Sequence, residues 1–178
     1  DKLAAKTAGS SGADLANIAN EAAIITARRN AKKITGKDLT EAFEKVAIGP
    51  ERKAKVMTEE EKRITAYHEA GHAIAGWFLE HANPLVKVTI VPRGTAALGY
   101  AQYTPTEQYL YNTDQLMDQI CMTLGGRAAE EIFFGKISTG ASNDFERATK
   151  LARDMVTRYG MSDAMGTMVY TGSEQDSF

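Results

Sequence analysis

Two histidines and a glutamate stand close together within residues 66–78, AYHEAGHAIAGWF. His68 and His72 are four residues apart, and Glu69 directly follows the first histidine. On a helix, residues i and i+4 share a face, so both imidazoles can point at one ion. Glu69 then lies about 100° round the helix, beside the ion rather than on it. A carboxylate placed there can take a proton from water made acidic by zinc, so the pattern predicts a zinc pair and a general base. The alternative is an ordinary helix on which this spacing arises by chance.

A third ligand must come from outside this stretch, because catalytic zinc normally has three protein ligands and one open position. The subclass His-Glu-x-x-His-x-x-Gly-x-x-His would need glycine at Ala75 and histidine at Phe78, so it is excluded. His81 is the only other histidine, and it follows His72 by nine residues on the same expected helix. The helical rise puts it more than about 13 Å further along the axis. We therefore expect a carboxylate as the third ligand.

Six acidic residues downstream are candidates for this ligand: Asp114, Asp118, Glu130, Glu131, Asp144 and Glu146. Asp144 is the first choice, because it follows the small, polar loop of residues 139–143 and opens a predicted helix. Its alternative role is that of a first-turn acid favoured by the helix dipole. Glu130 is the second choice, because a carboxylate inside an apolar-rich helix needs a partner. The residues alone leave both open.

The elements that must position these residues are mainly helices, with a small sheet. Capping boxes at Ser11, Thr35 and Thr58 begin three helices, and Thr113-Asp114 is expected to cap a fourth. The first two of these helices are predicted to end near Asn30 and before residues 49–50. The third and fourth are predicted to end at residues 80 and 134. A fifth helix is predicted from about residue 144 to about residue 158. The predicted strands are residues 86–91 and 99–103, which either pair ordinarily or bind substrate backbone.

Small residues in these helices predict close packing. Gly71 lies inside the expected zinc helix, and we interpret it as a clearance position that lets another segment pack against that helix. Gly125 and Gly126 lie inside the helix predicted to end at residue 134, and they indicate a close backbone approach to a neighbour. Cys121, in the same apolar stretch, is expected to be buried.

Composition narrows the function classes. The formal net charge is −2 and the basic residues are scattered, so nucleic acid is not an expected partner. The single cysteine excludes an internal disulfide and a cysteine-based zinc cluster. No run of 18 apolar residues and no signal peptide are visible. The sequence begins without Met, and we expect a fragment of a longer protein, with a boundary in the charged stretch 51–57 that separates residues 1–50 from residues 58–178.

Four motifs, in order within residues 58–166, resemble those of the FtsH-type membrane-anchored AAA+ zinc metalloproteases, with their M41-type peptidase domain. They are His68-Glu69-Ala70-Gly71-His72-Ala73, Val91-Pro92-Arg93-Gly94 with Leu98-Gly99-Tyr100, Leu124-Gly125-Gly126-Arg127-Ala128-Ala129-Glu130-Glu131, and Ser138-Thr139-Gly140-Ala141-Ser142-Asn143-Asp144. The resemblance implies that His68, His72 and Asp144 bind zinc and that Glu69 is catalytic. It implies for Glu130 a place near the site, as a structural residue or a neighbour of the ligands.

Residues 9–47 resemble the last helices of the same family's ATPase module, its C-terminal lid. The resemblance implies that the stretch around Gly12 and Ala13 approaches a bound nucleotide, whereas a capped helix start explains these residues equally simply. The chain contains no Gly-x-x-x-x-Gly-Lys-[Ser/Thr] phosphate loop. We therefore expect no ATP hydrolysis by this chain alone, and ATP as a cofactor only of the full-length protein.

The fold implied is a helical lid, incomplete, followed by a linker and a mostly helical zinc-protease domain that is truncated at its C-terminus. The implied function is ATP-dependent zinc endoproteolysis in membrane protein quality control, with misfolded or membrane proteins as substrates. A hexamer is expected for the full-length protein. We expect it to be anchored in the membrane through segments outside this chain, with the catalytic part on the cytoplasmic side in bacteria or the matrix or stromal side in organelles. The alternative is a proteolytically inactive assembly or adaptor fragment with an incidental HExxH. The presence of Glu69 favours the enzyme, because a purely structural zinc site would not need that carboxylate.

Overall fold

The computed structural model describes residues 4, 6–7, 9–52, 57–93, 98–104 and 108–170. They belong to two compact units, one made of Asp1–Glu69 and Asn83–Gln108, the other of Ala70–Ala82 and Tyr109–Phe178. Most of the expected linker, Gly94 of the second motif and the end of the tail lie outside the described residues. The prediction of a mainly helical chain with a small sheet is confirmed. No helix among the described residues is long and apolar enough to cross a membrane.

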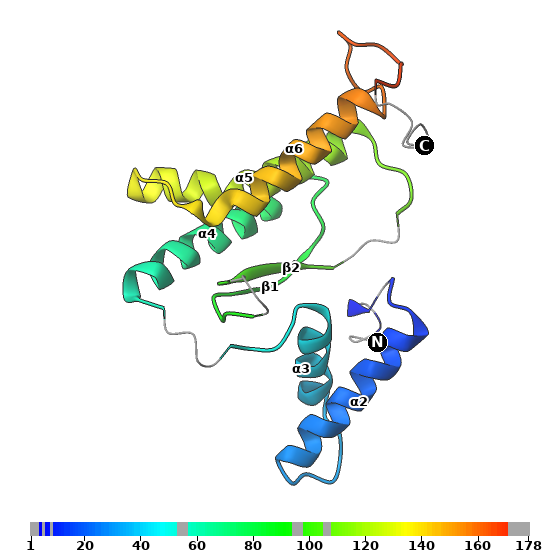
Figure 1. Cartoon of the computed structure of the whole chain (residues 1–178), viewed down its shortest axis with the longest axis vertical. Coiled ribbons are helices and arrows are strands. Elements are labelled where there is room, and N and C mark those ends of the chain that lie inside the picture. Colours follow the sequence, from blue (N-terminus) through cyan, green and yellow to red (C-terminus); the bar gives the residue numbers. More distant parts are fainter. Residues whose placement is uncertain are drawn as a thin grey trace, which may run out of the picture. The chain divides into compact units, whose positions relative to one another are not determined.

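Helices α2 (Gly12–Arg28) and α3 (Gly36–Ala47) pack against each other in the first unit (Figure 1). Both predicted capping boxes are present: each N-cap hydroxyl accepts from the N3 backbone amide, and each N3 aspartate accepts from the N-cap amide. The apolar faces meet in a small core, in which Ile18 and Phe43 are buried. Helix α2 ends slightly before the expected residue, because Asn30 has a left-handed φ of 55°.

Strands β1 (Leu85–Thr89) and β2 (Tyr100–Tyr103) form an antiparallel pair in the same unit. Leu85 lies opposite Tyr103 and Thr89 opposite Tyr100, with an irregularity between Leu85 and Lys87. The ordinary pairing of the two predicted strands is thus present. Strand β1 ends before the predicted residue 91, where the Val91 amide donates to the Thr89 hydroxyl instead of continuing the ladder.

A buried ion cluster joins α3 to the segment around β1. Glu44 of α3 is only 3% exposed, so its charge requires partners. Its carboxylate accepts from the Lys87 ammonium at 2.6 Å and from the Arg93 guanidinium at 2.7 Å. Arg93 is itself buried, whereas the Lys87 side chain is 40% exposed. Two cations therefore neutralise one buried carboxylate over long sequence separations.

Helix α4 (Glu59–Phe78) carries the HExxH stretch and runs through the division between the two units. It begins after Thr58, whose hydroxyl and amide both contact the Glu61 carboxylate as the predicted capping box requires. The helix ends earlier than predicted, so His81 lies beyond it rather than in its last turn. The His81 amide donates to Asp118 Oδ2 at 3.0 Å.

Helices α5 (Thr113–Phe134) and α6 (Ser142–Thr157) lie side by side in the second unit, joined by the 3-10 turn η1 (Thr139–Ala141) (Figure 1). The cap of α5 is Asn112, one residue before the predicted Thr113 cap, because its side chain accepts from the Gln115 amide. Helix α6 begins slightly earlier than predicted, directly after η1, which brings Asp144 into its first turn.

Helices α4 and α5 touch through their glycines, as the sequence predicted. A Cβ on Gly71 would collide with the carbonyl oxygen of Gly125, and a Cβ on Gly125 would lie 2.6 Å from the carbonyl oxygen of Gly71. Neither glycine has a left-handed φ, so each is needed for clearance rather than for backbone conformation. The prediction that Cys121 is buried is wrong: it lies on an exposed face of α5.

Candidate metal centre

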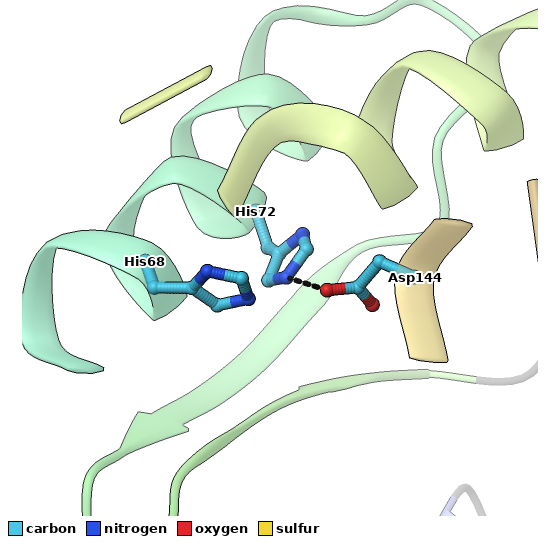
Figure 2. A group of neighbouring side chains, drawn as sticks. All are labelled: His68, His72 and Asp144. Atoms are coloured by element: carbon cyan, nitrogen blue, oxygen red, sulfur yellow. Dashed lines mark ion pairs between the residues drawn. The ribbon is translucent and has the colours of Figure 1, made fainter. Parts of the chain in front are cut away.

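His68 and His72 project from one face of α4, as the four-residue spacing predicted (Figure 2). His68 is 8% exposed, and the His72 side chain is 12% exposed. The two imidazoles are thus largely removed from bulk water on a continuous helix. Such a rigid support holds two ligands at a fixed separation.

Asp144 joins the two histidines from the first turn of α6. Its Oδ2 lies 3.4 Å from His72 Nε2, and one ligand atom from each of His68, His72 and Asp144 lies within 4.8 Å of the others. Tetrahedral zinc with bonds of about 2.1 Å separates its ligands by about 3.4 Å. Two imidazole nitrogens and a carboxylate oxygen are also a donor set that zinc accepts. The three residues therefore fit the three protein ligands of a catalytic zinc site.

The main chain of α5 orients the second histidine. His72 Nδ1 lies 2.9 Å from the carbonyl oxygen of Met122, a distance at which the protonated nitrogen donates to that oxygen. The Gly126 amide could donate to the same nitrogen in the other tautomer, but that contact is longer, at 3.3 Å, so the Met122 contact favours a proton on Nδ1. A proton on Nδ1 leaves Nε2, the nitrogen that faces Asp144, as the ligand atom. The glycine contact between α4 and α5 makes this approach possible, since Gly71 directly precedes His72.

Glu69 is buried to 8% exposure and lies next to the first histidine. Gly99, just before β2, packs against its side chain, since a Cβ there would lie 2.8 Å from Glu69 Cγ. Tyr103 is also near: burial raises the pKa of its phenol to about 12, and the negative charge of Glu69 adds to the rise. Glu69 therefore has an enclosed, defined environment suited to a single proton-transfer role.

Glu130, the second candidate ligand, lies outside the metal-binding group found among the described residues. It is 1% exposed, and its Oε2 accepts from the Ser138 amide at 2.9 Å. Ser138 is the N-cap of η1, and its hydroxyl accepts from the Gly140 amide. The buried carboxylate thus holds the turn that leads into α6, which carries Asp144.

The other four acidic residues considered as the third ligand lie away from the two histidines' metal-binding group. Asp118 accepts from the His81 amide, as described above. Asp114, Glu131 and Glu146 are exposed residues of α5 and α6. None of these four belongs to the group of described residues that could bind a metal.

Gly12 and Ala13, predicted to approach a nucleotide, form the exposed first turn of α2. A Cβ on Gly12 would meet no atom within 4 Å, so packing does not require this glycine. Ser11 and Asp14 satisfy the helix start through the capping box.

Sequence reasoning missed three parts of the site and its surroundings: the Met122 carbonyl, Gly99 and Tyr103. A backbone carbonyl carries no residue-type signal, so Met122 could not have been found. Gly99 stands in a motif used for the family resemblance, and a glycine beside a predicted strand is a signal of close approach. That signal names no partner, however, because Glu69 is thirty residues away in the chain.

Comparison with known proteins gives two family matches. The model of the family described as Peptidase family M41 matches residues 55–178, and that of the AAA+ lid domain matches residues 1–41. A rice protein (Oryza sativa subsp. japonica), ATP-dependent zinc metalloprotease FTSH 3, mitochondrial, is 55% identical over 97% of this chain and 22% of its own length.

Two further relatives come from a bacterium and an animal. The ATP-dependent zinc metalloprotease FtsH of Rhodothermus marinus is 52% identical over 97% of this chain and 25% of its own length. The mouse (Mus musculus) mitochondrial inner membrane m-AAA protease component AFG3L2 is 54% identical over 95% of this chain and 21% of its own length. The chain thus spans about a quarter or less of these relatives. With its peptidase motifs in place and the family model matching most of its length, the chain belongs to peptidase family M41.

Proposed function

We propose that this chain is the peptidase part, with the lid of an ATPase module, of an ATP-dependent zinc metalloendopeptidase. The observation that carries the proposal is the group of His68, His72 and Asp144, with Glu69 next to the first ligand. The names of the relatives support the same activity.

In this proposal His68, His72 and Asp144 hold zinc. Zinc bound there would polarise a substrate carbonyl and lower the pKa of water, which is the chemistry of catalytic zinc in hydrolases. The Met122 carbonyl keeps the proton of His72 on Nδ1, so that Nε2 stays available as a ligand.

Glu69 is the general base and then the general acid. Its carboxylate takes a proton from the attacking water as the water oxygen bonds to the peptide carbonyl carbon. When the carbon–nitrogen bond breaks, Glu69 returns that proton to the leaving amine. Hydrolysis is thereby balanced, with Glu69 unchanged at the end of the cycle. The contacts of Gly99 and the enclosed position of the carboxylate support this assignment.

The complete protein would add the remaining ATPase module and membrane segments. We infer protein substrates that are misfolded or membrane-bound, a hexameric assembly, and anchoring with the peptidase part on the cytoplasmic, matrix or stromal side. Gly12 and Ala13 would lie near the nucleotide in that assembly. The name of the mouse relative supports the membrane assignment, and the name of the bacterial relative supports the ATP assignment.

The decisive experiment compares the natural protein with its Glu69→Gln variant. Both should contain about one zinc per chain by elemental analysis, because Glu69 is not a ligand. Peptide cleavage by the complete protein should fall by roughly 10²- to 10⁴-fold in the variant, the range expected for loss of a general base. A chain without stoichiometric zinc at neutral pH would favour the inactive adaptor.

The third ligand is tested by Asp144→Ala beside Glu130→Ala. Loss of a ligand should weaken zinc affinity by more than the roughly 10- to 100-fold seen when a supporting residue is changed. Glu146→Ala changes an exposed acid of the same helix, and this matched control should bind zinc normally. A larger loss in Glu130→Ala than in Asp144→Ala would reverse the assignment.

A further inference from the structure

The backbone of Gly99 forms a wall against the side chain of Glu69. A Cβ added at Gly99 would lie 2.8 Å from Glu69 Cγ and 3.0 Å from Glu69 Oε1. Carbon atoms in folded proteins pack at about 3.5–4.0 Å, so there is no room for even a methyl group. Gly99 has no left-handed φ, and the glycine is therefore required for clearance.

Strand β1 also borders the space beside Gly99. The same added Cβ would lie 2.7 Å from the carbonyl oxygen of Thr89. Thr89 pairs with Tyr100, so this oxygen belongs to the paired end of the sheet. Backbone fixed in a ladder yields less readily than a side chain that can rotate about its torsions. A larger residue at position 99 would therefore displace Glu69 first.

We propose that Gly99 is a positioning residue for Glu69: the glycine backbone defines where the carboxylate lies beside the metal ligands. The proposal rests on the proposed function, in which Glu69 is the general base. Because Glu69 is only 8% exposed, its displaced side chain has few alternative places. A misplacement of about 1 Å in a catalytic group can reduce the rate by roughly 100-fold.

Tyr103, at the other end of strand β2, is a second residue near Glu69. Residues 99, 101 and 103 lie on one face of an extended chain, because side chains alternate along a strand. Burial raises the pKa of Tyr103, and the negative charge of Glu69 adds to the rise, so Tyr103 lies near enough to sense the carboxylate. Gly99 is the position on this face at which the chain approaches Glu69 without a side chain.

The catalytic test uses Gly99→Ala in the complete natural protein, with a fluorogenic peptide as substrate. We expect kcat to fall by about tenfold or more, KM to stay within about twofold, and zinc per chain to stay unchanged. Gly36→Ala is the matched control, because a Cβ there meets no atom within 4 Å. An unchanged kcat in Gly99→Ala would overturn the proposal, and so would zinc loss in parallel with activity, which would indicate a structural role through His68.

A stability cycle tests the contact without any activity measurement. The loss of melting temperature caused by Gly99→Ala should be smaller in a Glu69→Ala background, because the crowded Cγ is then absent. An equal loss of melting temperature in both backgrounds would show that Gly99 does not depend on this contact with Glu69, and it would overturn the proposal. If Gly99→Ala alone does not fold, recovery of folded protein in the double variant supports the proposal, and failure to recover overturns it. Cleavage retained by Glu69→Gln would instead overturn the proposed function, and with it the catalytic role of the contact.

Discussion

Two tyrosines of strand β2, Tyr100 and Tyr103, each lie near a different buried carboxylate, Glu44 and Glu69 respectively. Burial raises the pKa of Tyr100, the charge of Glu44 adds to the rise, and Lys87 and Arg93 oppose it. Burial and the charge of Glu69 raise the pKa of Tyr103, and no cation among the described residues opposes that shift. Positions 100 and 103 face opposite sides of a strand.

The difference separates a carboxylate that serves the fold, Glu44, from one that we propose serves the reaction, Glu69. Glu44 is neutralised by two cations at hydrogen-bond distance, so its charge is balanced within the structure. Glu69 lies beside metal ligands and against a glycine backbone, an arrangement that keeps a proton acceptor at a defined place. Burial alone therefore does not distinguish the two carboxylates; the groups that pack against each of them do.

Removing Glu44 should have the largest effect on stability. Glu44→Ala leaves Arg93, whose side chain is 9% exposed, as a buried charge without its carboxylate. Breaking a buried pair in this way lowers the free energy of unfolding by about 3–5 kcal/mol. Urea unfolding should show this loss as a lower midpoint. Glu41→Ala changes an exposed acid on the same helix and should leave the midpoint nearly unchanged. If Glu44→Ala lost zinc but kept its stability, the two carboxylates would not differ as described.

Removing Lys87 should have a smaller effect. Its side chain is 40% exposed, so water screens the pair with Glu44 and the expected loss is at most about 1 kcal/mol. Lys87→Met retains most of the aliphatic stem, which isolates the charge. The loss should shrink further at high salt, as measured by urea unfolding at two ionic strengths. A loss as large as that of Glu44→Ala would show that Lys87, rather than Arg93, balances the carboxylate.

The last comparison concerns stability at alkaline pH. Burial raises the pKa of the Tyr103 phenol in the folded protein to about 12, against about 10 for an ordinary tyrosine. Between these values the unfolded chain binds fewer protons than the folded one, so stability falls as the pH rises. Tyr103→Phe should flatten this part of the pH profile of the urea midpoint. Tyr100→Phe should flatten it less, because Lys87 and Arg93 offset the shift there; equal slopes in all three proteins would contradict both assignments.

Local signals in the sequence predicted the helices well. The capping boxes at Ser11, Thr35 and Thr58 form as predicted, because each involves residues only three apart. Helix ends were less predictable. At Asn112 two neighbouring residues, Asn112 and Thr113, could both cap a helix, and only the backbone path decides between them.

Long-range partners could not be read from the residues alone. Spacing placed His68 and His72 on one face, but it left Asp144 and Glu130 as alternatives. Both acids are largely buried, and only the fold brings the first to His72 and the second to the Ser138 amide. The ion cluster of Glu44 gave no sequence signal, since its partners come more than forty residues later.

The contact between Gly71 and Gly125 also limits how this region can vary. Each glycine is crowded by the other's carbonyl oxygen, an atom that every amino acid possesses. A larger residue at one position therefore cannot be compensated by a smaller one at the other, because the nearest obstacle is a backbone oxygen. Correlated substitution, the usual mark of residues in contact, is consequently not expected here. Any change at this crossing must be accommodated by moving the two helices apart, and His72 with them.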